Sequence, residues 1–143
     1  MRRAALALAV ALVAAGGAFA GDEQRPKFRW PLIGKIDQAK DGRGVDIAVP
    51  EGSAVHAAGD GTVIYASSEL ASYGQMIVIR HAGDYVTTYA HLSDMKVTKG
   101  VTVKRGEIIG KSGKSGGVAR PVLHFELRKG ETQLDPVRFL SPR

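Results

Sequence analysis

The sequence contains no cysteine, so a disulfide framework is excluded as a source of stability. Long helical patterns are also missing, because no stretch repeats its apolar residues every 3.6 positions over the length of a substantial helix. The chain instead has short apolar runs separated by glycine-rich turns. This pattern predicts a small all-β fold held together by apolar burial and strand pairing.

Long apolar runs are scarce, and the one at the N-terminus lies between Arg2-Arg3 and the small residues that end at Ala18-Phe19-Ala20. This arrangement predicts a secretory signal peptide over residues 1–20, cleaved after Ala20. The run is too short to span a bilayer, which needs about 20 apolar residues. No cysteine follows it to carry a lipid. We therefore expect an exported, periplasmic protein without a stable membrane anchor.

The expected mature chain has 123 residues, and removal of Arg2 and Arg3 leaves 18 basic against 14 acidic residues. That length suits one domain with a modest core. We expect a flexible lead at 21–29, the domain at 30–140 and a short tail at 141–143. The basic residues are spread along the chain without aromatic interleaving or a known nucleic-acid motif. This distribution argues against a nucleic-acid partner and predicts mild attraction to acidic polymers such as an anionic cell wall.

Two of the predicted strands bear histidines. In the segment Val122–Arg128, alternation places His124, Glu126 and Arg128 on one face and an apolar row on the other. In the segment Tyr85–His91, the same rule predicts that Tyr89 and His91 face outward together. A lone histidine on such a strand would normally be an ordinary polar residue.

The two remaining histidines lie outside these strands. His81 falls in the predicted turn of a hairpin formed by residues 76–80 and 85–91, and His56 lies opposite its apolar neighbours in a short strand. We expect both to be solvated histidines at a distance from any site.

Three segments carry a resemblance to a known family. The segment Pro121-Val122-Leu123-His124-Phe125-Glu126-Leu127-Arg128 resembles the His-x-His-Phe-Glu-x-Arg strand of LytM/lysostaphin-type zinc peptidases. Gly42-Arg43-Gly44-Val45-Asp46 is similar to the family's His-x-Gly-x-Asp segment, and Tyr89-Ala90-His91-Leu92 to its Tyr-x-His-Leu segment. The resemblance covers roughly Trp30 to Leu140. It implies a small antiparallel β-sandwich or barrel-sandwich.

The resemblance also implies a damaged metal site. In the family, zinc is held by the histidine and aspartate of the His-x-Gly-x-Asp segment and by the second histidine of the His-x-His pair. This sequence keeps Asp46 and His124 at ligand positions and His91 as a remnant catalytic histidine. Gly42 and Val122 stand where a zinc ligand and a catalytic histidine would be. If four ligands contribute about 10–16 kcal/mol, losing one costs about 3 kcal/mol of zinc binding, so we expect no catalysis, no metal and no cofactor.

A retained scaffold with lost chemistry resembles the degenerate LytM domains of the NlpD and EnvC type, which activate periplasmic cell-wall amidases. By this resemblance the partner is a periplasmic N-acetylmuramyl-L-alanine amidase or another wall hydrolase, with peptidoglycan as a second ligand. The partner would bind the vacated active-site groove, which we expect to be lined by Arg43, Asp46, Tyr73, Met76, Tyr89, His91, His124 and Arg128.

Two alternatives remain open at this point. One is a zinc metalloendopeptidase that cleaves peptidoglycan cross-links, with Zn²⁺ as its cofactor. The other is a passive peptidoglycan-binding module. Function must be argued from the site and not from the fold.

Overall fold

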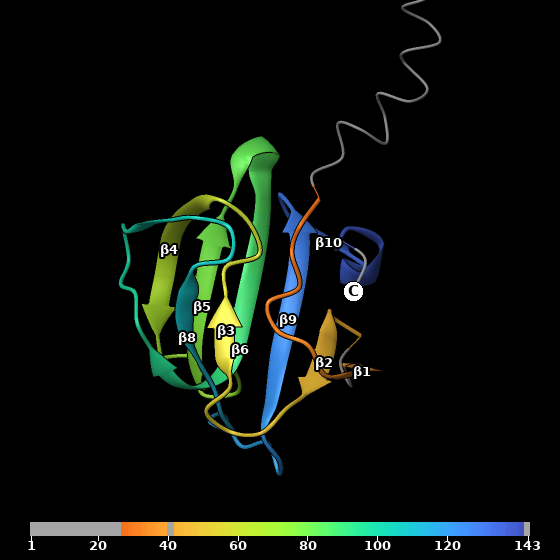
Figure 1. Cartoon of the computed structure of the whole chain (residues 1–143), viewed down its shortest axis with the longest axis vertical. Helices are drawn as coiled ribbons and strands as arrows, with labels where there is room; N and C mark the ends of the chain where they lie inside the picture. The colour runs from red at the N-terminus through yellow and green to blue at the C-terminus, as the bar shows by residue number, and fades with distance from the viewer. Residues whose placement is uncertain (1–26, 40–41, 142–143) are drawn as a thin grey trace, which may run out of the picture.

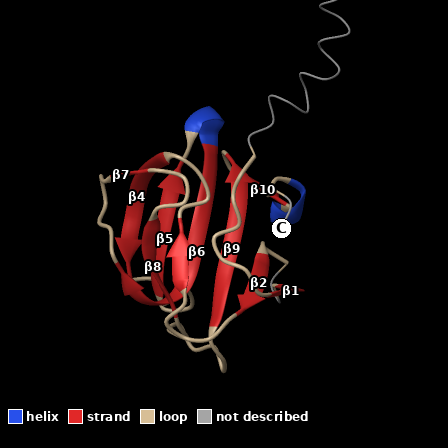
Figure 2. Cartoon of the chain, viewed as in Figure 1, coloured by secondary structure: helices blue, strands red, loops and turns tan. Residues whose placement is uncertain are grey.

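The structure is a computed structural model that describes residues 27–39 and 42–141. The predicted signal peptide and most of the predicted lead lie outside the described residues. Within them the fold is antiparallel and all-β, which confirms the predicted class (Figures 1 and 2). The strands are β1 (Lys35–Gln38), β2 (Val45–Ala48), β3 (Ala54–His56), β4 (Gly61–Ser67), β5 (Gln75–Arg80), β6 (Tyr85–Met95), β7 (Thr102–Val103), β8 (Ile108–Ser112), β9 (Val122–Lys129) and β10 (Thr132–Leu134). Two single-turn 3₁₀ helices, η1 (Ala82–Asp84) and η2 (Pro136–Arg138), complete the elements.

The strands form one sheet that folds over onto itself. The main order is β1-β2-β9-β6-β5-β4-β7, with β10 beside β9. Strand β6 changes partner along its length: Tyr85–Ala90 pair with β9, whereas Leu92–Met95 pair with β8. Strand β8 in turn pairs with β3. In Figure 1, β3, β8 and the N-terminal segment therefore lie in front of β6 and β9.

The main core fills the space between these two layers. Its fully buried side chains come from alternate positions of the sheet strands and from β3 and β8, and include Ile47, Val55, Ile77, Tyr89, Ile109, Leu123, Phe125 and Leu127. A second, smaller apolar cluster lies on the other face of the sheet and contains Met76, Val78, Val86 and Ala90, with Ile64, Tyr65 and Tyr73 packed against it. The sheet thus has one face in the core and a second face that combines apolar and polar side chains. We call this second face the His124 face.

The ends of the domain extend beyond the predicted limits. Phe28 is 3% exposed, forms a parallel bridge with Leu140, and accepts a hydrogen bond on its carbonyl from the Ser141 amide. The Trp30 indole donates to the Ser141 carbonyl at 2.7 Å. Phe28 and Ser141 are therefore parts of the fold, which corrects their placement in a flexible lead and a tail.

His81 is buried, and this corrects the expectation of a solvated rim residue. Its Nδ1 lies 2.8 Å from the Asp60 carbonyl, so Nδ1 carries the proton and donates it. Nε2 then accepts from the Thr87 hydroxyl at 2.7 Å, Thr87 accepts from the Tyr89 hydroxyl at 2.7 Å, and Tyr89 accepts from the Ala58 amide at 2.9 Å. With His81 neutral, all four of these hydrogen bonds have one donor and one acceptor. Burial lowers the pKa of His81, in agreement with that state.

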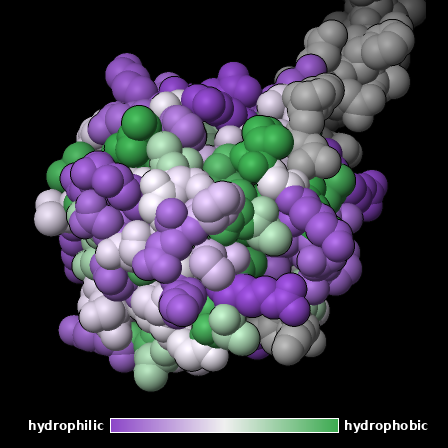
Figure 3. Space-filling model, turned by 60° about the horizontal axis from the view of Figure 1, so that its bottom comes forward, coloured by the Kyte–Doolittle hydropathy of each residue, from purple (hydrophilic) through white to green (hydrophobic). Residues whose placement is uncertain are grey.

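None of the described residues belongs to a helix long and apolar enough to cross a membrane. The surface seen in Figure 3 is mostly polar, with small apolar groups scattered between charged side chains.

Candidate functional site

The strand register brings the Gly42–Asp46 motif next to the strand that carries His124. Strand β9 lies between β2 and β6, and His124 is paired directly with Asp46 on one side and with Ala90 on the other. Gly44 makes this approach possible, because its φ is +71° and an added Cβ would collide with the Phe125 carbonyl. The two predicted ligand positions, Asp46 and His124, are therefore neighbours, as the motifs indicate.

His124 is held between two carboxylates. Its Nδ1 lies 2.7 Å from Asp46 Oδ1 and its Nε2 lies 2.6 Å from Glu126 Oε2. Both neighbours are acceptors when ionised, so two short contacts require a proton on each ring nitrogen. Burial lowers the pKa of His124, but the hydrogen bonds to Glu126 and Asp46 outweigh it and raise the pKa overall. The stable state of this cluster is an imidazolium between two carboxylates.

Glu126 is the centre of a wider network and was missed as a site residue in the sequence. Its carboxylate also accepts from the Tyr73 hydroxyl at 3.0 Å and from the Gln133 amide at 3.2 Å. Burial raises the pKa of Glu126, but the hydrogen bond to His124 outweighs burial, so the pKa is lowered overall. The signal in the sequence was the i, i+2 spacing of the two residues on one strand face. Tyr73 was expected near the site from the family resemblance, whereas Gln133, on the neighbouring strand β10, had no such signal.

The side chain of Arg43 joins this network at its outer edge. It hydrogen-bonds to Tyr73, which lowers the Tyr73 pKa, although burial and Glu126 raise that pKa overall. Arg43 is exposed, so it forms the accessible rim of the cluster.

His91 reaches the His124 face through a break in strand geometry. Its φ is +63°, a left-handed conformation that is uncommon and costly for a residue with a Cβ. The ring lies 6.0 Å from the His124 ring, and Nδ1 donates to the Ser115 carbonyl at 2.7 Å. Burial lowers the pKa of His91, so the ring is neutral and Nε2 carries the lone pair. The predicted proximity of His91 to His124 is thus found.

Tyr89 is the predicted site residue that the structure does not bring to the site. It has no exposed surface and packs edge-on against Phe125 in the main core. Burial raises the pKa of its hydroxyl to about 12. The prediction that Tyr89 and His91 face outward together is wrong, because the left-handed residue at 91 ends the alternation on which it depended.

The remaining predicted residues lie on the His124 face with different accessibility. Met76 is 5% exposed and belongs to the smaller apolar cluster, so it packs within this face and offers little surface to a partner. Arg128 is half-buried on the same side of β9 as His124, and its Nε is buried without a hydrogen-bond partner.

The cluster is closed and not the vacated groove that we expected. His91, His124 and Glu126 are each less than 9% exposed and are satisfied by one another or by Ser115 and Tyr73. The accessible parts of the predicted surface are Arg43, Asp46, Tyr73 and Arg128.

The donor set does not fit a catalytic zinc site, which needs three protein ligands and an open position. At the first ligand position Gly42 has no side chain, and both nitrogens of His124 are engaged by carboxylates. No group of three or more potential ligands in metal-binding geometry occurs among the described residues. His56 and His81 do not complete the site: His56 bonds to the Pro31 carbonyl and His81 to Thr87, whose side chain faces the main core side of the sheet.

One feature of a metal site is retained. A ligating histidine usually donates its second ring N–H to a carboxylate, which fixes the orientation of the ring. Glu126 occupies that position at Nε2, while Nδ1 faces Asp46.

The sequence is similar to several bacterial envelope proteins. It is 41% identical over 119 residues to the uncharacterized lipoprotein YgeR of Escherichia coli, covering 80% of this chain and 47% of that protein. It is 38% identical over 125 residues to the cell division protein DipM of Caulobacter vibrioides (81% and 20%). It is 40% identical over 121 residues to the murein hydrolase activator NlpD of Escherichia coli (81% and 32%). The chain thus spans less than half the length of these relatives.

Solved structures show the same fold. A zinc-containing peptidase from Vibrio cholerae superposes with a TM-score of 0.69 at 32% identity, covering 78% of this chain and 40% of that one. The catalytic domain of lysostaphin from Staphylococcus simulans superposes with a TM-score of 0.64 at 30% identity, covering 80% and 87%. The model of peptidase family M23 matches residues 40–136, which include all three motifs and the His124 cluster. The chain belongs to peptidase family M23.

Proposed function

We propose that this protein is a non-catalytic M23 domain that regulates peptidoglycan remodelling in the cell envelope by activating a wall hydrolase. The observation that carries the proposal is the state of His124, whose two nitrogens are both engaged by carboxylates beside a glycine at the first ligand position. Such a cluster lacks the third ligand and the open position that zinc hydrolysis needs. A second general acid or base is also missing at Val122.

The relatives support the regulatory part of the proposal. NlpD is named as a murein hydrolase activator and DipM as a cell division protein. The shared region in each is the M23 domain, since it is the part that this chain covers. For this chain we propose the periplasm as the location and an N-acetylmuramyl-L-alanine amidase as the first partner to test.

The partner would bind the accessible part of the His124 face. Arg43, Tyr73 and Arg128 supply guanidinium and phenol groups, which are the side chains that most often dominate binding energy at interfaces. The Nε of Arg128 is buried, so a carbonyl or carboxylate of a partner segment would bind the accessible part of this half-buried side chain.

The test uses the purified protein alone and with the periplasmic amidases of its host. We expect less than stoichiometric zinc by elemental analysis, no product from purified sacculi with the protein alone, and a higher rate of sacculus hydrolysis when a responsive amidase is added. Stimulation that persists after the Arg128→Ala change would contradict the proposed surface.

The zinc endopeptidase remains the second candidate because Asp46, His124 and the supporting Glu126 keep a metal-like arrangement. It predicts one tightly bound zinc per chain and cleavage of cross-links that is lost on His124→Ala. Those two results together would replace the regulatory proposal.

A further inference from the structure

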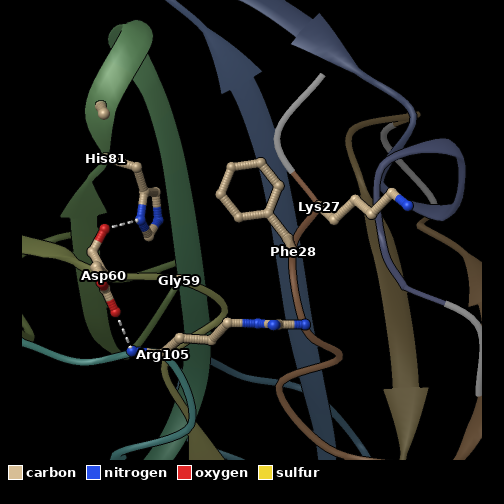
Figure 4. Close-up of a pocket in the computed structure, with 7 residues that line it drawn as sticks. Lys27, Phe28, Gly59, Asp60, His81 and Arg105 are labelled. Carbon is tan, nitrogen blue, oxygen red and sulfur yellow. Dashed lines mark hydrogen bonds between the residues drawn. The ribbon is translucent and has the colours of Figure 1, made fainter. Parts of the chain in front are cut away.

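A second surface lies on the opposite side of the molecule from the His124 face. The N-terminal segment from Lys27 to Ile33 packs over the main core, and its outer side carries two hollows of about 250 and 470 Å³. Phe28, Asp60, His81 and Arg105 are among the residues that line the first (Figure 4). Trp30, Ile33 and His56 are among those that line the second. We call the two hollows and Arg29, which lies between Phe28 and Trp30, the N-terminal trough.

The backbone of Arg29 is held at the middle of this trough. Its backbone amide donates to the Ala58 carbonyl at 2.8 Å, and Gly106 donates to the neighbouring Ala57 carbonyl at 2.8 Å. The Arg29 side chain lies across Gly106, where an added Cβ would come within 2.5 Å of Nη1. The absence of a side chain at position 106, the residue after Arg105, therefore leaves room for the Arg29 side chain.

Several cations lie in or next to the N-terminal trough. Lys27, Arg29 and Arg105 line its hollows and Lys104 precedes Arg105, and none of the four forms an ion pair with the described part of the chain. Two carboxylates are nearby, but each accepts from a backbone amide: Asp60 from Arg105 at 2.7 Å and Glu107 from Lys104 at 3.0 Å. Figure 4 shows the Arg105 side chain extending across the first hollow towards the segment that carries Phe28. The surface thus offers one arginine in each of the two hollows, Arg105 in the first and Arg29 in the second, to an anionic ligand.

The aromatic rings of the trough are recessed. Phe28 is 3% exposed and Trp30 is 7% exposed, whereas Ile33, at 64%, is the apolar side chain of this segment that projects. Binding to a membrane surface through a protein of this kind needs apolar groups that protrude into the bilayer interface. Cations set between shallow hollows fit a polymer strand better, because its acidic groups can meet the guanidiniums while its backbone lies along the trough.

We propose that the N-terminal trough binds the carboxylate-bearing strands of the cell wall, with Arg29 and Arg105 contacting the carboxylates. The wall as the source of the ligand rests on the function proposed above. Because the trough and the His124 face lie on opposite sides of the sheet, one domain would hold the wall on one side and a hydrolase on the other. Such an arrangement would place the activated enzyme next to its substrate.

The experiment measures co-sedimentation of the full chain with protein-free sacculi. The test variant is Arg29→Ala with Arg105→Ala, and the charge-matched control is Lys114→Ala with Arg120→Ala, two exposed cations of the loop before β9. We expect the test variant to lose about tenfold or more in affinity and the control to stay within about twofold, because charge-assisted contacts are local. Sacculi whose carboxylates have been converted to amides should bind the wild type as weakly as native sacculi bind the test variant. Arg105→Ala alone serves if the double variant fails to fold by circular dichroism.

Three outcomes would overturn the proposal. Equal losses in test and control variants would show general attraction of a basic protein, and undiminished binding to amidated sacculi would remove the carboxylate as the ligand. Binding to phosphatidylglycerol vesicles but not to sacculi would make this a membrane surface. Amidase stimulation in solution is measured on the same variants, and we expect Arg29→Ala with Arg105→Ala to retain it. The experiment therefore distinguishes a failure of the proposed wall binding from a failure of the proposed amidase activation.

Discussion

At the scale of single residues, the protonation state of His124 explains the arrangement of the site. In a zinc peptidase the metal neutralises the carboxylate and orients the histidine. In this protein a proton on each nitrogen of His124 does the same for Asp46 and Glu126 at 2.7 and 2.6 Å. The imidazolium is thus a stable substitute for the missing cation. It also keeps the residues close to their metal-binding positions.

The first prediction follows from this retained arrangement. The double change Gly42→His and Val122→His should raise zinc affinity more than about a hundredfold, because the ligand restored at position 42 contributes about 3 kcal/mol. Space is available at Gly42, where an added Cβ meets nothing within 4 Å, although its φ of +76° will cost about 1–2 kcal/mol of strain. Isothermal titration with Zn²⁺ measures the affinity. Unchanged zinc binding in a folded double variant would show that the position has lost its metal geometry.

Glu126 provides the control for that experiment. Added to the double variant, Glu126→Gln removes the carboxylate at Nε2 without removing a ligand. Loss of such outer support typically costs 10- to 100-fold in metal affinity. If the triple variant binds zinc as tightly as the double variant, Glu126 does not orient His124.

Single residues also set the limit of what the sequence could predict. Asp46, His91 and His124 were found because their motifs fix them in register, and all three are at the site. Tyr89 was placed on the wrong face because the left-handed backbone at His91 turns that side chain to the face opposite Tyr89. The amino-acid sequence gives no sign of this backbone conformation. Tyr73 and Gln133 close the site by bonding to Glu126, which lies 53 positions from Tyr73 and 7 positions from Gln133. The periodicity of the sequence does not predict contacts of this kind.

At the scale of elements, the segment between β8 and β9 is pinned to His91. The Ser115 hydroxyl donates to the Leu92 carbonyl at 2.7 Å and accepts from the Gln75 amide at 3.0 Å. Gly116 fits closely between the backbone at 73–74 and the His91 ring. Although the segment is rich in glycine, these contacts hold it against the site.

The second prediction uses two adjacent glycines in this segment. Both have a positive φ, +87° at Gly116 and +80° at Gly117, so alanine at either position should cost about 1–2 kcal/mol of backbone strain. At Gly116 a Cβ would also come within 2.7–2.9 Å of the Gly74 amide, the Tyr73 carbonyl carbon and His91 Nδ1, whereas at Gly117 it meets nothing within 4 Å. Gly116→Ala should therefore be less stable than Gly117→Ala by about 1–3 kcal/mol in urea unfolding. Equal stabilities would mean that the segment is free to move away from His91.

The third prediction concerns the turn between β5 and β6. His81 links this turn to the 59–61 turn and to Tyr89, and its pKa is lowered by burial. A lowered folded-state pKa means that the unfolded chain binds more protons, so stability should be complete above pH 6.5 and fall as the pH drops from there towards the folded-state pKa. His124 has a raised pKa and contributes with the opposite sign, so the measurement must isolate His81.

His81→Asn supplies that isolation. Asparagine keeps a donor near the position of Nδ1 but does not titrate, and His124 is unchanged. The variant should be less stable than the wild type at pH 8 by about 1–3 kcal/mol, because the Thr87 hydroxyl loses its acceptor. The difference should shrink as the pH falls from 6.5 to 5. A difference that stays constant over this range would show that His81 does not titrate with folding.

The fold was more predictable than the boundaries of its elements. Short alternating runs and glycine turns were enough for the all-β class, whereas the order of β2, β9 and β6 around the site was not predicted from the sequence. The partner change along β6 and the burial of Phe28 against Leu140 were not predictable, because both depend on tertiary packing at positions with no local signal.

At the scale of the whole molecule, the sheet separates two surfaces of different chemistry. The main core lies on one side, covered by β3, β8 and the N-terminal segment that forms the trough. On the other side the remnant cluster is closed, so a partner would meet its rim. The remnant cluster is therefore a hydrogen-bonded platform whose accessible rim consists of Arg43, Tyr73 and Arg128.

The fourth prediction tests this platform. Arg128→Ala should weaken binding to a responsive amidase by at least about 2 kcal/mol, the usual threshold for a dominant interface residue, because the complex would desolvate the half-buried arginine against acceptors of the partner. Lys129→Ala is the matched control: it removes one cation from the next residue, which points to the other side of β9 and lies 5.1 Å from the Tyr85 ring. Tyr89→Ala is unsuitable as a surface test, since loss of this buried ring should cost about 3–5 kcal/mol of stability. Titration calorimetry against the amidase, with sacculus hydrolysis as the second readout, gives both quantities. If Arg128→Ala and Lys129→Ala bind alike, the partner does not use the His124 face, and the opposite surface becomes the place to look for it.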